Sequence, residues 1–236
     1  MDVDLIVPMK HPRDGKSRLR GAVEADRHPG LVLALAKDTL AAVTASAEVR
    51  RVLLVAADPR AVAELGELGV EIVEEPAEKT LNAAFRHGEA LLRADDPDAV
   101  VGALQADLPA LRAGDLTTAL AEAEALAAAA AAAQSAAAAQ SPAAGPAHNA
   151  ARRAFVADRQ GTGTTLLLAA PGEPLDPRFG PASARLHAAS GAIALSAPLP
   201  TLRSDVDTPD DLAHVRALGV GKHTAAFLRE PCALPH

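Results

Sequence analysis

Short apolar runs alternate with segments of helical character along the first 104 residues. The apolar runs are residues 5–7, 52–56, 70–73 and 99–104, and the helical segments between them are 31–45, 59–68 and 81–92. Repeated strand–helix units predict a mostly parallel sheet with right-handed crossovers. Further strands are expected at 155–157, 164–169 and 192–196, a short helix at 183–189 and a long final helix from Thr208. The fold class is therefore α/β.

The chain is expected to form a single domain, residues 1–236, interrupted by one unusual segment. Residues 121–150 contain 18 alanines, at first uninterrupted by helix breakers and then mixed with Ser, Pro and Gly. This composition predicts an extended helix that runs into a flexible surface loop. We expect the insertion to carry no chemistry.

Composition narrows the possible functions. A 49% hydrophobic chain with four Phe and no Trp or Tyr must build an aliphatic core, and its net charge of −7 argues against a nucleic-acid-binding protein. The single cysteine, Cys232, excludes disulfide frameworks and cysteine-based zinc sites and favours a cytoplasmic location. No signal peptide is evident, and the alanine-rich segment is too weakly apolar for a membrane span.

An acidic residue, Asp107, follows the apolar run 99–104 and precedes Pro109. Ligands of open α/β sheets bind outside the carboxyl ends of the strands, where a carboxylate can hold a divalent cation against phosphates. A solvent-exposed turn aspartate is the alternative. Asp205 and Asp207 lie on the same side of an extended segment near the C-terminus and can converge with Asp107 on Mg²⁺. For Asp207, capping of the last helix is the alternative.

The segment after the first strand concentrates positive charge in an otherwise acidic chain. Lys10, Arg13, Lys16 and Arg18 all lie within nine residues. At the ligand-binding edge of a parallel sheet such cations suit a nucleoside triphosphate, although the spacing of a Walker A loop is absent. A solvated basic loop is the alternative.

Three further features are weaker when each is considered alone. Residues 161–165, Gly-Thr-Gly-Thr-Thr, form either a close-approach ligand turn or an ordinary hairpin turn. Gly180 precedes a helix start at 181–183, with Ser183, that can offer free N–H groups to an anion or can simply begin a helix. Asn82 can bind a nucleobase edge through its amide or can cap a helix.

Taken together and in order, these motifs resemble a known enzyme family. The set comprises Val-Pro-Met-Lys…Gly-Lys-Ser-Arg-Leu from residue 7, Leu-Asn at 81–82, Gln-Ala-Asp-Leu-Pro at 105–109, Gly-Thr-Gly-Thr-Thr at 161–165, Arg-Phe-Gly-x-x-Ser at 178–183 and Asp-Val-Asp-Thr-Pro-Asp-Asp-Leu at 205–212. It is similar to the guanylyltransferases of coenzyme F420 biosynthesis, which act on phosphoenolpyruvate or 2-phospho-L-lactate. The resemblance covers nearly the whole chain outside 121–150.

The resemblance implies a GT-A-like, Rossmann-type nucleotidyltransferase fold with three αβα layers. It implies that phosphoenolpyruvate is held by Thr165, Gly180 and Ser183. It implies that Mg²⁺ is bound by Asp107 and Asp205, and that the triphosphate of GTP is bound by Lys16 and Arg18. Thr80 stands where the family pattern has Gly, so the base contact at that loop departs from the pattern.

The implied reaction is transfer of GMP from GTP to phosphoenolpyruvate, with product passed to the next transferase of the deazaflavin pathway. Alternative acceptors are 2-phospho-L-lactate and 3-phosphoglycerate, which differ from phosphoenolpyruvate by an oxidation state or a hydroxyl. Another nucleotidyltransferase or a non-catalytic nucleotide-sensing domain are further alternatives; the presence of both Asp107 and Asp205 disfavours the sensor. No nucleic-acid or membrane partner is expected.

Overall fold

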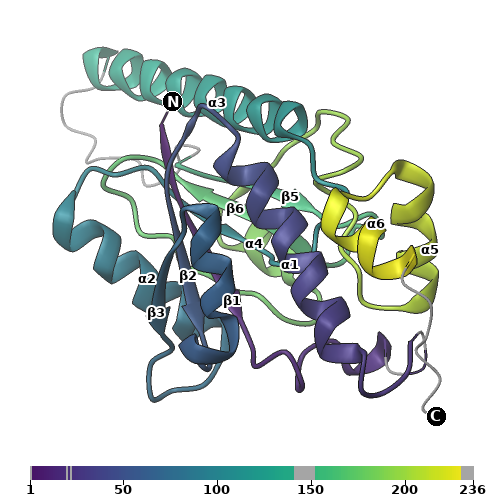
Figure 1. Ribbon diagram of the computed structural model, residues 1–236. Coiled ribbons are helices and arrows are strands. Elements are labelled where there is room, and N and C mark those ends of the chain that lie inside the picture. The colour runs from purple at the N-terminus through teal and green to yellow at the C-terminus, as the bar shows by residue number, and fades with distance from the viewer. Residues whose placement is uncertain (1, 20, 22, 141–151, 230–236) are drawn as a thin grey trace, which may run out of the picture.

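Seven strands form one sheet at the centre of the protein (Figure 1). The computed structural model describes all residues except 1, 20, 22, 141–151 and 230–236. In chain order the strands are β1 (Val3–Met9), β2 (Val49–Ala56), β3 (Glu71–Glu74), β4 (Val101–Leu104), β5 (Arg153–Ala157), β6 (Thr164–Ala169) and β7 (Ile193–Ala194). Their spatial order is β3-β2-β1-β4-β6-β5-β7, and β6 is antiparallel to both of its neighbours while the other described pairs are parallel. The mostly parallel α/β sheet predicted from the sequence is confirmed.

Helices cover both faces of this sheet. They are α1 (His28–Thr44), α2 (Leu81–Asp95), α3 (Ala113–Gln140), α4 (Ser183–Ala189), α5 (Pro209–Leu218) and α6 (Lys222–Arg229), with 3₁₀ segments η1 (Ser17–Leu19) and η2 (Pro59–Leu68). Leu5 and Val7 of β1 point toward α1, η2 and α3, whereas Ile6 points toward α2 and α4. This two-residue alternation divides the aliphatic core into two layers, so the predicted three-layer αβα architecture is confirmed.

Two elements differ from the sequence expectation. The segment 59–68 is a 3₁₀ rather than an α-helix, capped by Asp58 and ended by Gly69 in the left-handed conformation. The expected long final helix is two helices, because the helical conformation is interrupted at residues 219–221 before α6 begins. Asp38 of α1 accepts hydrogen bonds from the backbone N–H groups of His223 and Thr224 and so caps α6. α5 and α6 pack on α1 through a third apolar cluster.

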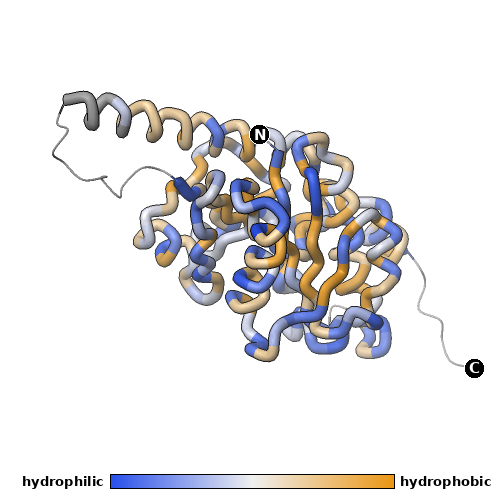
Figure 2. The backbone as a smooth tube through the Cα atoms, turned by 90° about the vertical axis from the view of Figure 1, so that its left-hand side faces the viewer, coloured by the Kyte–Doolittle hydropathy of each residue, from blue (hydrophilic) through white to orange (hydrophobic). Residues whose placement is uncertain are grey.

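The alanine-rich segment begins as predicted with a helix. α3 projects beyond the rest of the protein (Figure 2), and most side chains described over 121–133 are exposed. Its portion Ala113–Ala133 is long and apolar enough to meet a membrane-span criterion of length and composition alone, with 22% of the tested window buried. The predicted loop at 141–150 and Cys232 lie outside the described residues.

Candidate active site

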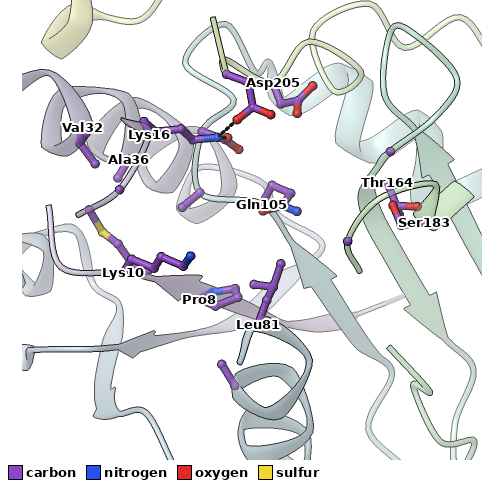
Figure 3. Close-up of a pocket in the computed structure, with 18 of the residues that line it drawn as sticks. Pro8, Lys10, Lys16, Val32, Ala36, Leu81, Gln105, Thr164, Ser183 and Asp205 are labelled. Carbon is purple, nitrogen blue, oxygen red and sulfur yellow. Dashed lines mark hydrogen bonds and ion pairs between the residues drawn. The ribbon is translucent and has the colours of Figure 1, made fainter. Parts of the chain in front are cut away.

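A cleft of about 720 Å³ opens at the carboxyl ends of the parallel strands. β1, β2, β3 and β4 all end or lead into loops at this edge, and β6 begins there because it runs in the opposite direction. This is the position at which open α/β sheets bind ligands. Figure 3 shows three groups of side chains around the cleft: Lys16 with the acids, Thr164 with Ser183, and Lys10 with Pro8 and Leu81.

Three carboxylates converge at one side of the cleft. Asp107, Asp205 and Asp207 each contribute an oxygen, and these oxygens all lie within 4.8 Å of one another. Asp107 is 5% exposed, which rules out a solvated turn aspartate. The helix-capping role considered for Asp207 is also wrong, because Thr208 and Asp211 form the capping box of α5. The predicted convergence of acids from two distant segments is confirmed, although only Asp107 follows a strand; Asp205 and Asp207 lie in a segment without a strand before α5.

Lys16 lies among these carboxylates. Its Nζ forms ion pairs with Oδ2 of Asp107 and, at 2.6 Å, with Oδ1 of Asp207. The backbone of Lys16 is left-handed, with φ of 53°. Burial raises the pKa of Asp205 to about 6; Lys16 opposes this rise, and Asp207 and Asp158 add to it. Thus the single ammonium group only partly compensates the crowded negative charge.

The cluster has the donors that a hard divalent cation requires. All three groups offer carboxylate oxygens, the ligands preferred by Mg²⁺. Oδ1 of Asp107 is buried and has no hydrogen-bond partner in the described structure. A buried unpaired carboxylate oxygen is unfavourable unless another group compensates it. These residues therefore fit a Mg²⁺ site.

The basic loop lies beside the acids. Lys10, Lys16 and Arg18 line the cleft, whereas Arg13 does not. Within the described part of the chain, the side chains of Lys10 and Arg18 have no hydrogen-bond or ion-pair partner, so both are available to phosphates. The buried ring of His28 anchors the loop, since its Nε2 lies 2.8 Å from the carbonyl oxygen of Gly15. The loop is therefore positioned by the fold and not merely solvated.

The third group of side chains corrects one sequence expectation. Gly180 and Ser183 line the cleft as expected, but Thr165 does not: it is fully buried and its hydroxyl donates weakly to the Val156 carbonyl, at 3.4 Å. The preceding residue, Thr164, lines the cleft instead and lies beside Ser183 (Figure 3). The cause is a β-bulge, in which Ala157 pairs with Thr164 and Val156 with Leu166, leaving Thr165 without a paired residue in β5.

Two backbone features considered for ligand binding, the turn at 161–165 and the start of α4, make hydrogen bonds within the protein. The turn glycine Gly163 lines the cleft and leaves room for the side chain of Asp158, because a Cβ there would meet Oδ2 of Asp158 at 2.4 Å. Asp158 accepts hydrogen bonds from the N–H groups of Thr162 and Gly163. At the start of α4, the N–H of Ser183 donates to Gly180 and that of Ala184 to Thr162. Neither of these two amides is free for a phosphate, so within 181–183 only the N–H of Ala182, which also lines the cleft, remains for the expected helix-start site.

Asn82 plays neither of the roles that its sequence context suggested. Its Nδ2 donates to the carbonyl oxygen of Phe179 at 3.0 Å, and its Oδ1 accepts from the N–H of Phe179 at 2.8 Å. Phe179 engages both the nitrogen and the oxygen of the amide, and Asn82 does not line the cleft, so the expected nucleobase contact is wrong. Thr80, not Asn82, caps α2. Asn82 holds the loop that leads to Gly180.

The cleft has a more apolar end at the carboxyl ends of β1, β2 and β3. Pro8, Val55, Leu81 and Ala84 contribute apolar walls there. Glu75, directly after β3, also lines this part, and its carboxylate has no partner among the described residues. Apolar walls with one accepting group suit a purine base. No motif in the sequence had singled out Glu75, Asp158 or Thr164 individually, although Thr164 lay within a recognised motif.

Comparisons with known proteins agree with the geometry of this cleft. The profile of the family described as "Guanylyl transferase CofC like" matches residues 3–137. This chain belongs to that family. A relative in Streptomyces scabiei (strain 87.22), named phosphoenolpyruvate guanylyltransferase, is 45% identical over 96% of this chain and 95% of its own. One of the same name in Mycobacterium sp. (strain KMS) is 40% identical over 94% and 90%.

Solved structures support the fold assignment. A protein described as a nucleotide-diphospho-sugar transferase from Desulfovibrio desulfuricans G20 matches with a TM-score of 0.65 and 18% identity, over 97% of this chain and 95% of that one. A nucleotidyl transferase from Methanothermobacter thermautotroptrophicus matches with a TM-score of 0.53 and 16% identity, over 97% and 98%. At these identities the likeness concerns the fold alone, which is that of nucleotidyltransferases.

Proposed function

We propose that this protein transfers GMP from GTP to phosphoenolpyruvate, giving enolpyruvoyl-2-diphospho-5'-guanosine and pyrophosphate for coenzyme F420 biosynthesis. The observation that carries the proposal is the agreement along nearly the whole chain with relatives named phosphoenolpyruvate guanylyltransferase, at 40–46% identity. The cleft supports the proposal. Its three carboxylates and the neighbouring Lys and Arg side chains lie between a more apolar end and an end lined by hydroxyl groups.

In the proposed reaction, a phosphate oxygen of phosphoenolpyruvate attacks the α-phosphorus of GTP. A new P–O bond forms there, the bond from the α-phosphorus to the bridging oxygen breaks, and pyrophosphate leaves with that electron pair. A phosphate monoester has a second pKa of about 6 and is mostly a dianion at neutral pH, so no general base is required. No histidine is among the described residues that line the cleft. The main task is to bring two polyanions together in line.

The side chains divide this task between them. Lys10 and Arg18 are placed to bind the phosphates of GTP, Arg18 with the two-pronged geometry of a guanidinium. Asp107, Asp205 and Asp207 would hold Mg²⁺, which when bound supplies charge neutralisation and alignment of phosphate oxygens. Lys16 contributes positive charge between the carboxylates and the cleft.

The two substrates would occupy opposite ends of the cleft. The base of GTP fits the walls formed by Val55, Leu81 and Ala84, and the acid fits beside Thr164 and Ser183. The hydroxyl of Ser183 makes no hydrogen bond with any described residue, although the residue is only 2% exposed. A nearly buried, unpaired hydroxyl is suited to donate to a carboxylate or phosphate. We place the reaction in the cytoplasm, where the product would pass to the next transferase of the pathway.

The test is mass spectrometry of the products formed from GTP, Mg²⁺ and each of three acids. Phosphoenolpyruvate should give the guanylylated product and pyrophosphate, with 2-phospho-L-lactate and 3-phosphoglycerate much slower. Coupling to the next pathway enzyme captures a labile product. Faster reaction with either other acid would reassign the acceptor, and GTP binding without reaction would identify a nucleotide-sensing domain.

A further inference from the structure

A buried histidine lies behind the end of the cleft where Thr164 and Ser183 would bind the acceptor substrate, here called the acceptor end. It contacts the two segments that form this end. His187 of α4 is fully buried and does not line the cleft. Its Nε2 lies 2.9 Å from the backbone nitrogen of Arg178, and its Nδ1 lies 2.9 Å from Oγ1 of Thr164. The ring therefore connects the loop before Gly180 to the threonine that faces the cleft.

The backbone contact determines which ring nitrogen carries the proton. The N–H of Arg178 can only donate, so Nε2 of His187 must accept. In a neutral imidazole the hydrogen is then on Nδ1, and Nδ1–H donates to Oγ1 of Thr164. Burial lowers the pKa of His187 to about 4; the charge of Arg153 contributes, Asp176 opposes, and Arg178 adds slightly. The ring stays neutral at neutral pH in this tautomer.

This hydrogen bond also determines what Thr164 can do. Its oxygen accepts from the ring, so its own proton must point elsewhere, and no described residue receives it. Thr164 lines the cleft beside Ser183 (Figure 3). The open direction is therefore the acceptor end, where an anionic oxygen would take the proton. Phe179 packs edge-on against the imidazole at 5.1 Å between ring centroids, which fixes the ring plane.

We infer that His187 is a positioning residue that turns the Thr164 hydroxyl into a donor toward the anionic acceptor substrate. Through Arg178 the same ring also fixes the backbone that leads to Gly180. The inference rests on the proposed function in placing the acid beside Thr164 and Ser183. It adds a residue outside the cleft that prepares the site before the substrate arrives.

Two substitutions separate the two contacts of the ring. In His187→Gln the amide oxygen reaches the Nε2 position and can still accept from Arg178, but the donor to Thr164 is lost. In His187→Asn the amide nitrogen occupies the Nδ1 position and can still donate to Thr164. We expect the KM for phosphoenolpyruvate to rise about tenfold in His187→Gln, less in His187→Asn, and the KM for GTP to stay within about twofold in both. His87→Gln on α2 is the matched control.

A double-variant cycle distinguishes positioning from general destabilisation. Thr164→Val should raise the same KM about tenfold, and adding His187→Gln should raise it little further, since the histidine acts through that hydroxyl. Thr118→Val on the exposed side of α3 controls for the threonine change. Multiplicative effects, or equal rises in both KM values, would overturn the inference. Should His187→Gln fail to fold, an unchanged acceptor KM in Thr164→Val would overturn it alone. Absence of turnover in the unmodified protein would instead refute the proposed function.

Discussion

Replacing Asp205 by Asn should make the protein more stable and nearly inactive. The pKa of Asp205 is raised from 3.8 to about 6, chiefly by burial. Because the folded-state pKa lies above the unfolded one, ionised Asp205 destabilises the fold at neutral pH. A difference of about 2 units corresponds to about 3 kcal/mol. Solvent screening of this half-buried group reduces the expected gain from the amide to about 1–2 kcal/mol.

The sign of the effect gives a pH signature. The stability advantage of Asp205→Asn should be full above about pH 7 and should shrink as the pH falls through 6 toward 4, where the native carboxyl is protonated. Denaturant unfolding at pH 8 and pH 5 without Mg²⁺ measures it. Pyrophosphate release from GTP and phosphoenolpyruvate should fall about 10²-fold or more, since the amide removes charge that holds the ion.

The exposed Glu67 on η2 provides the control. Glu67→Gln makes the same change of carboxylate to amide outside the cleft, and should alter neither readout appreciably. An Asp205→Asn protein that is no more stable at pH 8 would refute the argument from crowded charge. Retention of turnover at saturating Mg²⁺ would refute the assignment of Asp205 to the metal site.

Four further outcomes are expected. Asp107→Asn should also lower turnover about 10²-fold, and the double variant with Asp205→Asn should lose little beyond the worse single one across a Mg²⁺ titration, because residues acting as a unit are not additive. Deleting residues 127–147 with a short Gly/Ser joiner should leave turnover within a few-fold; loss of soluble protein would show instead that the segment stabilises the fold. Glu75→Gln should lower kcat/KM for GTP about tenfold or more and raise kcat/KM for XTP relative to that for GTP. The reason is that a carboxylate accepts from both N–H groups on the guanine edge, whereas an amide can also donate. An unchanged ratio of kcat/KM for XTP to that for GTP would remove Glu75 from the base site. As the pH falls from 6.5 to 4, the free energy of unfolding of the unmodified protein should decrease by up to about 3 kcal/mol relative to that of His187→Gln. The reason is that His187 binds a proton in the unfolded chain but not in the folded protein, where its pKa is about 4. Parallel pH profiles of the two proteins would contradict this.

The fold was accessible from the sequence where periodicity determines structure. Apolar runs alternating with helical segments predicted the parallel sheet, because each strand must be buried on both faces. The interruption between α5 and α6 could not be predicted from the sequence, because it depends on a residue that is distant in the chain. Asp38 of α1 caps α6, and a Cβ on Gly221 would meet that carboxylate at 2.4 Å. Nothing near residue 221 in the sequence indicates a carboxylate 183 positions earlier.

The site shows the same division. Asp107 was predictable at this edge because it follows a buried strand, and Asp205 and Asp207 were predictable as a pair because alternate residues of an extended segment share one side. The two segments are joined by a backbone contact, in which the N–H of Val206 donates to the carbonyl oxygen of Asp107. Which of Thr164 and Thr165 faces the cleft was not predictable, since a bulge shifts the alternation of side chains along β6 at that point. Asn82 has the amide of a base-reading residue, but Phe179, nearly a hundred residues away, occupies both of its groups. Local chemistry identified the candidates, and long-range packing decided which of them face the cleft.

The placement of Lys16 joins two predictions that the sequence had kept separate. It was expected on the triphosphate of GTP, and the acids were expected on Mg²⁺, yet its ammonium group pairs with Asp107 and Asp207. With all three aspartates ionised, the cluster carries three negative charges and one positive charge, leaving −2. A divalent cation carries the opposite charge, and Oδ1 of Asp107 is left unpaired by the lysine. By charge, therefore, Lys16 and Mg²⁺ complement rather than replace each other, and the phosphates of GTP would meet a site already near neutrality.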